Sequence, residues 1–181
     1  MNAEIIVAAG AGRMGRGLAV VFALAGHQVA LVDLKTREDA AAYLDAASVE
    51  IRNTLKMLVA CGMIGAADVD RVAARIGYVA MDRAGAAIAE ADVIFEGVPE
   101  VLDAKRKAFS FISDTANPDA IITSTTSTIL SDELQGMVSH PERFLNAHWL
   151  NPAFLVPLVE LSPGEATDPD VTARLVALLE R

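Results

Sequence analysis

A histidine and a carboxylate lie in an otherwise apolar stretch near the end of the sequence. The segment FLNAHWLNPAFLVPLVEL contains His148, Asn151 and Glu160 among residues typical of a buried strand. An unpaired carboxylate or a charged imidazole is costly to bury, so His148 and Glu160 are expected to form a hydrogen bond with each other. A histidine titrates near neutral pH, and a carboxylate on its other ring nitrogen fixes the tautomer and favours the protonated ring. The pair is therefore a candidate for moving a proton.

A glycine-rich stretch near the N-terminus is the second candidate. It fits the pattern G-x-G-x-x-G, follows an expected strand and opens an expected helix, which is the context in which this pattern binds a dinucleotide. The first glycine permits the tight turn, the second lets the backbone approach a pyrophosphate, and the third lets helix and strand pack closely. The structural alternative is a glycine turn without a nucleotide. The residues are Gly10, Ala11, Gly12, Arg13, Met14 and Gly15.

Asp33 closes the second expected strand, near the position about 20 residues beyond the glycines where a carboxylate binds the adenosine ribose hydroxyls. A 2′-phosphate would be repelled by that carboxylate, so NAD is favoured over NADP. Lys35 is close enough along the chain to keep that preference open.

The elements that must position these groups follow from alternating apolar runs and breakers. Strands and helices alternate, which predicts a mainly parallel sheet covered on both faces, with ligands at the carboxyl ends of the strands. A turn at Asn151-Pro152 joins the last two strands. The expected strands are 4–10, 28–33, 75–80, 92–98, 120–125, 143–149 and 155–161. The expected helices are 14–26, 37–60, 66–75, 83–90, 100–116, a short helix at 131–134, and one beginning near Asp168.

Composition narrows the class of protein. The chain has 181 residues, 53% of them hydrophobic, which suits one domain or slightly more with a substantial core. A net charge of −9 argues against nucleic-acid binding by bulk electrostatics, although a local pocket can still take an anion. A single cysteine, no membrane-length apolar run and no signal peptide favour a cytoplasmic protein with no membrane partner. No metal site is expected.

The sequence resembles the NAD-binding domain of the L-3-hydroxyacyl-CoA dehydrogenase family along essentially its whole length. The resemblance rests on the order and spacing of GAGRMGRGLAVVFALAGHQVALVD, EADVIFEGVPEVLDAKRKAF, STTST and HPERFLNAHWLNPAFLVPLVEL. It implies a Rossmann-type α/β fold and oxidation of a 3-hydroxyl to a ketone with hydride transfer to NAD. It also implies a small-molecule substrate, a role in fatty acid metabolism and a homodimer when full length.

The resemblance also implies roles for individual residues. His148 matches the family's catalytic histidine and Glu160 its carboxylate partner, while Ser127 matches a serine that hydrogen-bonds the reacting oxygen. Asn151 matches an asparagine that helps form the site. The residues Glu100 and Lys105 match those that line the nicotinamide end of the cofactor.

Each role has a structural alternative. His148 can be a core histidine, Ser127 a turn or cap residue, and Asn151 a residue that only shapes the turn before Pro152. Glu160 can be a purely structural partner of the histidine. Lys105 lies beside two other basic residues and can belong to a solvated helix face.

Three departures from the family pattern bear on function. The family usually has SNTSS where this chain has STTST, so Thr125 replaces an asparagine. Acyl-CoA members tend to have lysines where this chain has Cys61-Gly62-Met63, and basic residues there would contact the phosphates of CoA. Their absence weakens the acyl-CoA interpretation, although Arg52, Lys56 or Arg75 can compensate. Finally, the chain stops at Arg181, before the family's helical dimerisation domain.

The expectation is one NAD-binding Rossmann domain, residues 1–181, truncated before that helical domain. The expected enzyme is of the NAD-dependent 3-hydroxyacyl-CoA dehydrogenase type. Two alternatives stay open: an NAD-dependent dehydrogenase of a small free 3-hydroxy acid, similar to carnitine or L-gulonate dehydrogenase, and a nucleotide-binding module without catalysis.

Overall fold

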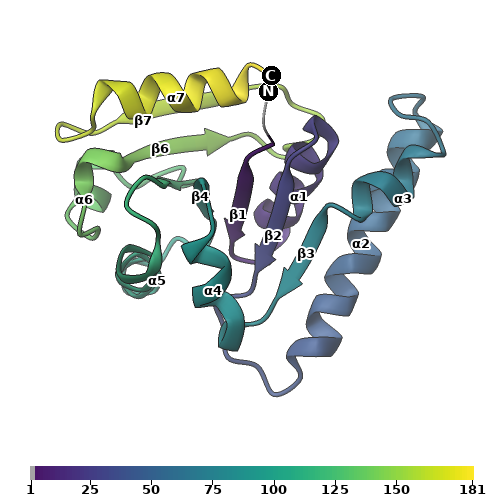
Figure 1. The fold of residues 1–181 in the computed structure, drawn as a ribbon, viewed down its shortest axis with the longest axis horizontal. Coiled ribbons are helices and arrows are strands. Elements are labelled where there is room, and N and C mark those ends of the chain that lie inside the picture. Colours follow the sequence, from purple (N-terminus) through teal and green to yellow (C-terminus); the bar gives the residue numbers. More distant parts are fainter. Residues whose placement is uncertain (1–2) are drawn as a thin grey trace.

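The structure, a computed structural model, describes residues 3–181 and contains a seven-stranded sheet with helices on both faces (Figure 1). The strand order is β3-β2-β1-β4-β5-β6-β7, and all neighbours are parallel except β6 and β7. The predicted doubly wound, mainly parallel Rossmann-type sheet is confirmed. The strands are β1 (Ile5–Ala9), β2 (Gln28–Val32), β3 (Ile76–Val79), β4 (Val93–Glu96), β5 (Ile121–Ser124), β6 (Phe144–Trp149) and β7 (Val159–Pro163).

Two hydrophobic clusters, one on each side of the sheet, hold the helices in place. Helices α1, α2, α3 and α7 contribute to one cluster, and α4, α5 and α6 to the other. Within residues 3–181, no helix is both long enough and apolar enough to span a membrane. The helices are α1 (Arg13–Ala25), α2 (Ala40–Ala60), α3 (Asp68–Ala73), α4 (Ala84–Ala89), α5 (Leu102–Thr115), α6 (Ser131–Gln135) and α7 (Pro169–Leu179), with 3₁₀ turns η1 (Met81–Arg83) and η2 (Pro141–Arg143).

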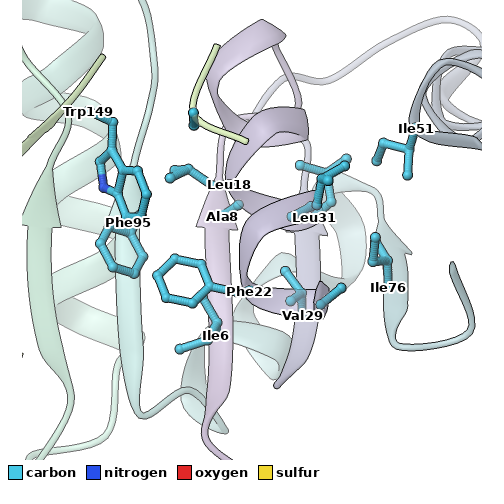
Figure 2. Close-up of a cluster of buried hydrophobic side chains, with 14 of the residues drawn as sticks. Ile6, Ala8, Leu18, Phe22, Val29, Leu31, Ile51, Ile76, Phe95 and Trp149 are labelled. Atoms are coloured by element: carbon cyan, nitrogen blue, oxygen red, sulfur yellow. The ribbon is translucent and has the colours of Figure 1, made fainter. Parts of the chain in front are cut away.

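Three aromatic rings fix helix α1 against the strands that carry the candidate site (Figure 2). The ring centroid of Phe22 on α1 lies 5.0 Å from that of Phe95 on β4 and 5.6 Å from that of Trp149 on β6. Such pairs contribute about 0.5–1.5 kcal/mol each beyond the apolar area they bury. Because Trp149 directly follows His148, this packing also fixes the end of β6 where the histidine lies.

Two predicted boundaries are wrong, and each has a local cause. The strand expected at 155–161 begins only at Val159, because residues 152–156 form a turn in which the N–H groups of Leu155 and Val156 donate to the Pro152 carbonyl. The helix expected from residue 37 begins at Ala40. Asp39 is the N-cap of α2, and its carboxylate accepts a hydrogen bond from the Ala42 N–H at 2.8 Å.

Candidate active site

A large cleft lies at the carboxyl ends of β1, β2 and β4. It has a volume of about 690 Å³ and opens where the strand order reverses between β1 and β4, the usual ligand position in such sheets. Its walls come from the glycine loop, the end of β2 and the start of α5. Lining residues include Gly10, Gly12, Met14, Asp33, Gly97, Glu100, Lys105 and Ser127.

The three glycines of the loop differ in what a side chain would meet. A Cβ on Gly15 would lie 1.9 Å from the Gly10 carbonyl oxygen, and one on Gly10 would lie 2.7 Å from the Gly97 oxygen. Gly10 also has a φ of +132°, which disfavours any other residue. A Cβ on Gly12 would meet no protein atom within 4 Å, and Gly12 caps α1 without a side-chain hydrogen bond. The N–H groups at this helix start are thus available to a phosphate.

The two residues between Gly12 and Gly15 line different cavities. Met14 lines the large cleft, whereas Arg13 borders a second cavity with Arg16, Glu50 and Asn151. Arg13 therefore lines the same cavity as Asn151, the expected substrate-site asparagine, and does not line the large cleft.

Asp33 lies at the end of β2, as expected for a ribose-binding carboxylate, but it already has a partner. Its side chain, 4% exposed, forms an ion pair with Arg37, and this hydrogen bond raises the pKa of Arg37. The Arg37 guanidinium lies over the ring of Tyr43, 3.4 Å from its centroid. The Tyr43 hydroxyl donates to the Ala11 carbonyl at 2.9 Å, which ties this group to the glycine loop.

A buried ammonium group organises the opposite wall of the cleft. Lys105 is 1% exposed, and its Nζ lies 3.1 and 3.0 Å from the two carboxylate oxygens of Glu96, 3.4 Å from Ser124 Oγ and 3.4 Å from a carboxylate oxygen of Glu100. The alternative that Lys105 belongs to a solvated helix face is wrong, because α5 directs it onto the strand ends. Ser124 Oγ donates to Glu96 at 2.7 Å and completes the network.

The two carboxylates around Lys105 differ in burial, and their pKa values shift in opposite directions. Burial raises the pKa of Glu96, although Lys105, Ser124 and the Val98 N–H offset part of that rise. Partial burial acts to raise the pKa of Glu100 as well. There it is outweighed by hydrogen bonds from the Ser127 N–H and the Thr126 hydroxyl, and by Lys105, so the pKa of Glu100 is lowered. Glu100 is thus held ionised against the loop that carries Ser127.

Ser127, His148 and Glu160 form a continuous hydrogen-bonded chain at the same edge of the sheet. His148 Nε2 lies 3.1 Å from Ser127 Oγ, and His148 Nδ1 lies 2.8 Å from Glu160 Oε2. The antiparallel pairing of β6 with β7 sets His148 directly opposite Glu160, as the expected strand pair requires. The carboxylate favours the Nδ1–H tautomer, which leaves Nε2 as the acceptor nitrogen that faces Ser127 Oγ.

The expectation that this pair is buried is wrong. The His148 side chain is 27% exposed and that of Glu160 is 60% exposed, because β7 is the edge strand and one face of it is open. The alternative of a core histidine is wrong for the same reason. The buried histidine is His27: its Nδ1 accepts from the Glu4 N–H at 3.1 Å, and burial lowers its pKa.

Asn151 is not brought against the histidine. It is exposed, precedes a cis peptide bond to Pro152, and lines the second cavity. No hydrogen bond of its side chain to His148 occurs among residues 3–181.

Several residues that shape the site were missed by the sequence analysis. Thr126 and Asn146 hold the Ser127 loop: the Thr126 hydroxyl donates to Glu100 at 2.8 Å, and Asn146 Nδ2 donates to the Thr126 carbonyl at 3.2 Å. Glu96 carried a usable signal, since it is a lone carboxylate within the apolar strand VIFEG. Arg37 carried a weaker one, its position four residues after Asp33.

Comparisons with known proteins all indicate the same family. Residues 5–181 match the family described as 3-hydroxyacyl-CoA dehydrogenase, NAD binding domain. The chain is 34% identical to 5-formyl-3-hydroxy-2-methylpyridine 4-carboxylate 5-dehydrogenase of Mesorhizobium japonicum, over 94% of this chain and 52% of that protein. It is 32% identical to 3-hydroxyadipyl-CoA dehydrogenase of Escherichia coli, over 98% of this chain and 36% of that protein.

A solved structure agrees with the sequence matches. The crystal structure of 3-hydroxybutyryl-CoA dehydrogenase from Escherichia coli superposes with a TM-score of 0.88 at 32% identity, covering 99% of this chain and 36% of that one. The chain belongs to the 3-hydroxyacyl-CoA dehydrogenase family, to its NAD-binding domain. The predicted resemblance and NAD as cofactor are confirmed at the level of that family. The chain spans about half, or less, of the length of these relatives.

The glycine loop yields a paired prediction. We expect Gly15→Ala to lower the melting temperature strongly, because its Cβ would overlap the Gly10 carbonyl. Gly12→Ala should leave the melting temperature unchanged and weaken NADH binding by about tenfold or more, since its Cβ would point into the space for the phosphates. Thermal unfolding and NADH fluorescence titration measure the two effects. Equal NADH affinity in Gly12→Ala and the unmodified protein would contradict this assignment.

Removal of the buried ammonium group should destabilise the fold in a pH-dependent way. Lys105→Met leaves the Glu96 carboxylate buried without its cation, and we expect the free energy of unfolding to fall by about 3–5 kcal/mol at pH 8. Burial raises the pKa of Glu96, so the folded state binds this proton more tightly than the unfolded state. Ionisation of Glu96 therefore destabilises the variant as pH rises, and the loss should be smaller at pH 5. Urea unfolding, monitored by the fluorescence emission of Trp149, measures the loss in the free energy of unfolding at each pH.

Two controls accompany this experiment. Adding Glu96→Gln to Lys105→Met removes the unpaired charge and should recover much of the stability at pH 8. Lys107→Met, two residues along α5 and exposed, should change stability by less than about 0.5 kcal/mol. A loss in Lys105→Met that is the same at pH 5 and pH 8 would show that Glu96 ionisation is not its cause.

Proposed function

We propose that the protein transfers hydride between the 3-hydroxyl carbon of a 3-hydroxyacyl-CoA and NAD, as a 3-hydroxyacyl-CoA dehydrogenase-type oxidoreductase. The observation that carries this proposal is the Ser127–His148–Glu160 chain at the rim of the cleft that the glycine loop opens. Family membership supplies the cofactor, and the hydrogen-bonded chain supplies a base for the substrate hydroxyl.

Oxidation of a secondary alcohol requires that its hydroxyl proton leave as the carbon loses hydride. Bound NAD supplies the hydride acceptor. His148 Nε2 accepts the hydroxyl proton, and the Nδ1–H bond to Glu160 stabilises the imidazolium that results. In the reverse direction the imidazolium returns that proton to the ketone oxygen.

Ser127 orients the reacting oxygen in this scheme. Its hydroxyl lies within hydrogen-bond distance of His148 Nε2, so an oxygen placed beside both contacts the base and a second hydrogen-bonding group. Glu100 holds the Ser127 backbone N–H at 2.8 Å and thereby fixes the loop. We assign Asn151 to the substrate side, where it lines the second cavity with Arg13.

The charge of the cleft supports an anionic cofactor. Its wall carries Lys35, Arg37, Lys105 and Lys107 against Asp33 and Glu100, although the chain as a whole has a net charge of −9. A positive cleft in a negative protein favours a dinucleotide pyrophosphate locally while the remaining surface repels polyanions. We therefore propose a small-molecule substrate and no nucleic-acid or membrane partner.

The wider setting is also proposed from the resemblance. Residues 1–181 would act as one NAD-binding domain together with a helical dimerisation domain, in a cytoplasmic homodimer that serves fatty acid metabolism. Glu100 and Lys105 would border the nicotinamide end of the cofactor, consistent with their place on the cleft wall.

A second candidate substrate is a small free hydroxy acid. Two basic side chains of α2 and α3 that could contact CoA phosphates already have acidic partners, because Arg52 pairs with Asp70 at 2.7 Å and Arg71 pairs with Asp68 at 2.6 Å. Lys56 remains as an exposed cation near the end of α2. The relative from Mesorhizobium japonicum is named as a dehydrogenase of a pyridine carboxylate, and the name of that substrate contains no CoA. The paired arginines favour a free acid over a CoA thioester, and the similarity to a dehydrogenase favours an enzyme over a module without catalysis.

The base can be tested by substitution. In the full-length gene product, His148→Gln should lower kcat by about 10²–10⁴-fold, because Gln cannot accept the proton, while NADH affinity stays unchanged. His140→Gln is a matched control, since His140 is exposed and pairs with Glu142 at 3.1 Å on another part of the surface. Steady-state kinetics and NADH titration measure both. Full activity in His148→Gln would remove this residue from the mechanism.

The substrate can be tested on the same protein. We expect NADH oxidation with acetoacetyl-CoA that His148→Gln abolishes, which would support the acyl-CoA assignment. Turnover only in a panel of free 3-hydroxy acids with NAD would assign the protein to the carnitine- or gulonate-like branch. Inactivity with both classes, alongside intact NADH binding, would favour a nucleotide-binding module without catalysis.

A further inference from the structure

The end of the cleft beside β2 has an unusual charge arrangement for an NAD site. A ribose-binding carboxylate discriminates against NADP because it repels the 2′-phosphate, and it does so best when nothing neutralises it. Here the Asp33 carboxylate, 4% exposed, forms an ion pair with Arg37, and Lys35 lines the same end of the cleft. The three charges together are positive rather than negative.

Arg37 engages Asp33 through two of its nitrogens. Nε donates to one carboxylate oxygen, and Nη2 lies 3.4 Å from the other. A guanidinium has five N–H donors, so three remain for another acceptor. The Arg37 side chain is 28% exposed and lines the cleft, which leaves these donors open to a ligand there.

The position of Arg37 is fixed by more than Asp33. Its guanidinium carbon lies over the Tyr43 ring, 3.4 Å from the ring centroid, and the Tyr43 hydroxyl donates to the Ala11 carbonyl of the glycine loop. Stacking on an aromatic ring and a forked ion pair both limit the rotamers of an arginine. The donors of Arg37 are thus preorganised beside the carboxylate that marks the ribose 2′-position.

We propose that this site accepts NADP(H) as well as NAD(H), with Arg37 as the contact for the 2′-phosphate, Lys35 as a second cation and Asp33 as the contact for the unmodified ribose. Arginine suits this role because its planar fork spans a carboxylate and a phosphate at once. The inference rests on the proposed function, since it assumes that the glycine loop binds a dinucleotide.

Two fragments that differ only in the 2′-phosphate test it. Calorimetric titration of the full-length protein with 2′,5′-ADP and with ADP, and fluorescence titration with NADPH and NADH, report binding without turnover. We expect each 2′-phosphorylated ligand to bind within about tenfold of its partner. Discrimination of about 100-fold or more against the 2′-phosphate would overturn the proposal.

Two variants distinguish a specific contact between Arg37 and the 2′-phosphate from a general attraction of the cleft for anions. Arg37→Ala should weaken 2′,5′-ADP by about tenfold or more and change ADP by less than about threefold. Lys107→Ala removes another cation from the cleft wall, on α5, and should affect the two fragments equally. An equal loss of both fragments in Arg37→Ala would refute the assigned contact.

A second variant covers the case in which Arg37→Ala fails to fold because Asp33 is left buried without a partner. Asp33→Asn keeps Arg37 and removes the carboxylate, so 2′,5′-ADP affinity should rise and ADP affinity should fall. No change in the ratio of the two affinities would overturn the proposal. Failure of NADH and ADP to bind the unmodified protein at all would refute the proposed function itself, a result distinct from selective rejection of the 2′-phosphate.

Discussion

The ammonium group of Lys105 is the interaction on which the candidate site depends. Lys105 lies on α5 and binds the end of β4 through Glu96 and the end of β5 through Ser124. It also pairs with Glu100, in the loop between β4 and α5. Glu100 in turn binds the Ser127 N–H, and Ser127 reaches His148. A charge buried this deeply is stabilised only while its partners keep their positions, so the network penalises displacement of any of these strand ends.

The single antiparallel strand explains how the histidine obtains its partner. In a parallel sheet the carboxyl ends of neighbouring strands meet at one edge, which brings Ser127 and His148 together from β5 and β6. The pairing of β7 in the opposite direction brings its first residues to that same edge, so Glu160 lies opposite His148. The open face of this edge strand also leaves the pair accessible, as a base that must reach a substrate requires.

The sequence predicted the parts of the fold and site that depend on local patterns. Apolar runs located the strands, the glycine pattern located the loop at α1, and the spacing of His148 and Glu160 around Asn151-Pro152 predicted a strand pair. It could not predict the exposure of Glu160, because an apolar segment reads as buried whether or not its strand is at the edge of the sheet. Nor could it predict that Lys105 points inward while its neighbours Arg106 and Lys107 point to solvent, since that depends on how α5 lies over the strand ends.

The distribution of charge links the fold to the choice of ligand. A net charge of −9 spread over the surface gives no reason to expect an anionic ligand, and an Asp at the end of β2 gives a reason to expect unphosphorylated ribose. The folded chain alters both expectations, because basic side chains distant in sequence line the same cleft and Arg37 neutralises Asp33. If Arg37 contacts the 2′-phosphate as proposed, ligand selection is set by local pairs of charges rather than by the sum of charges along the chain.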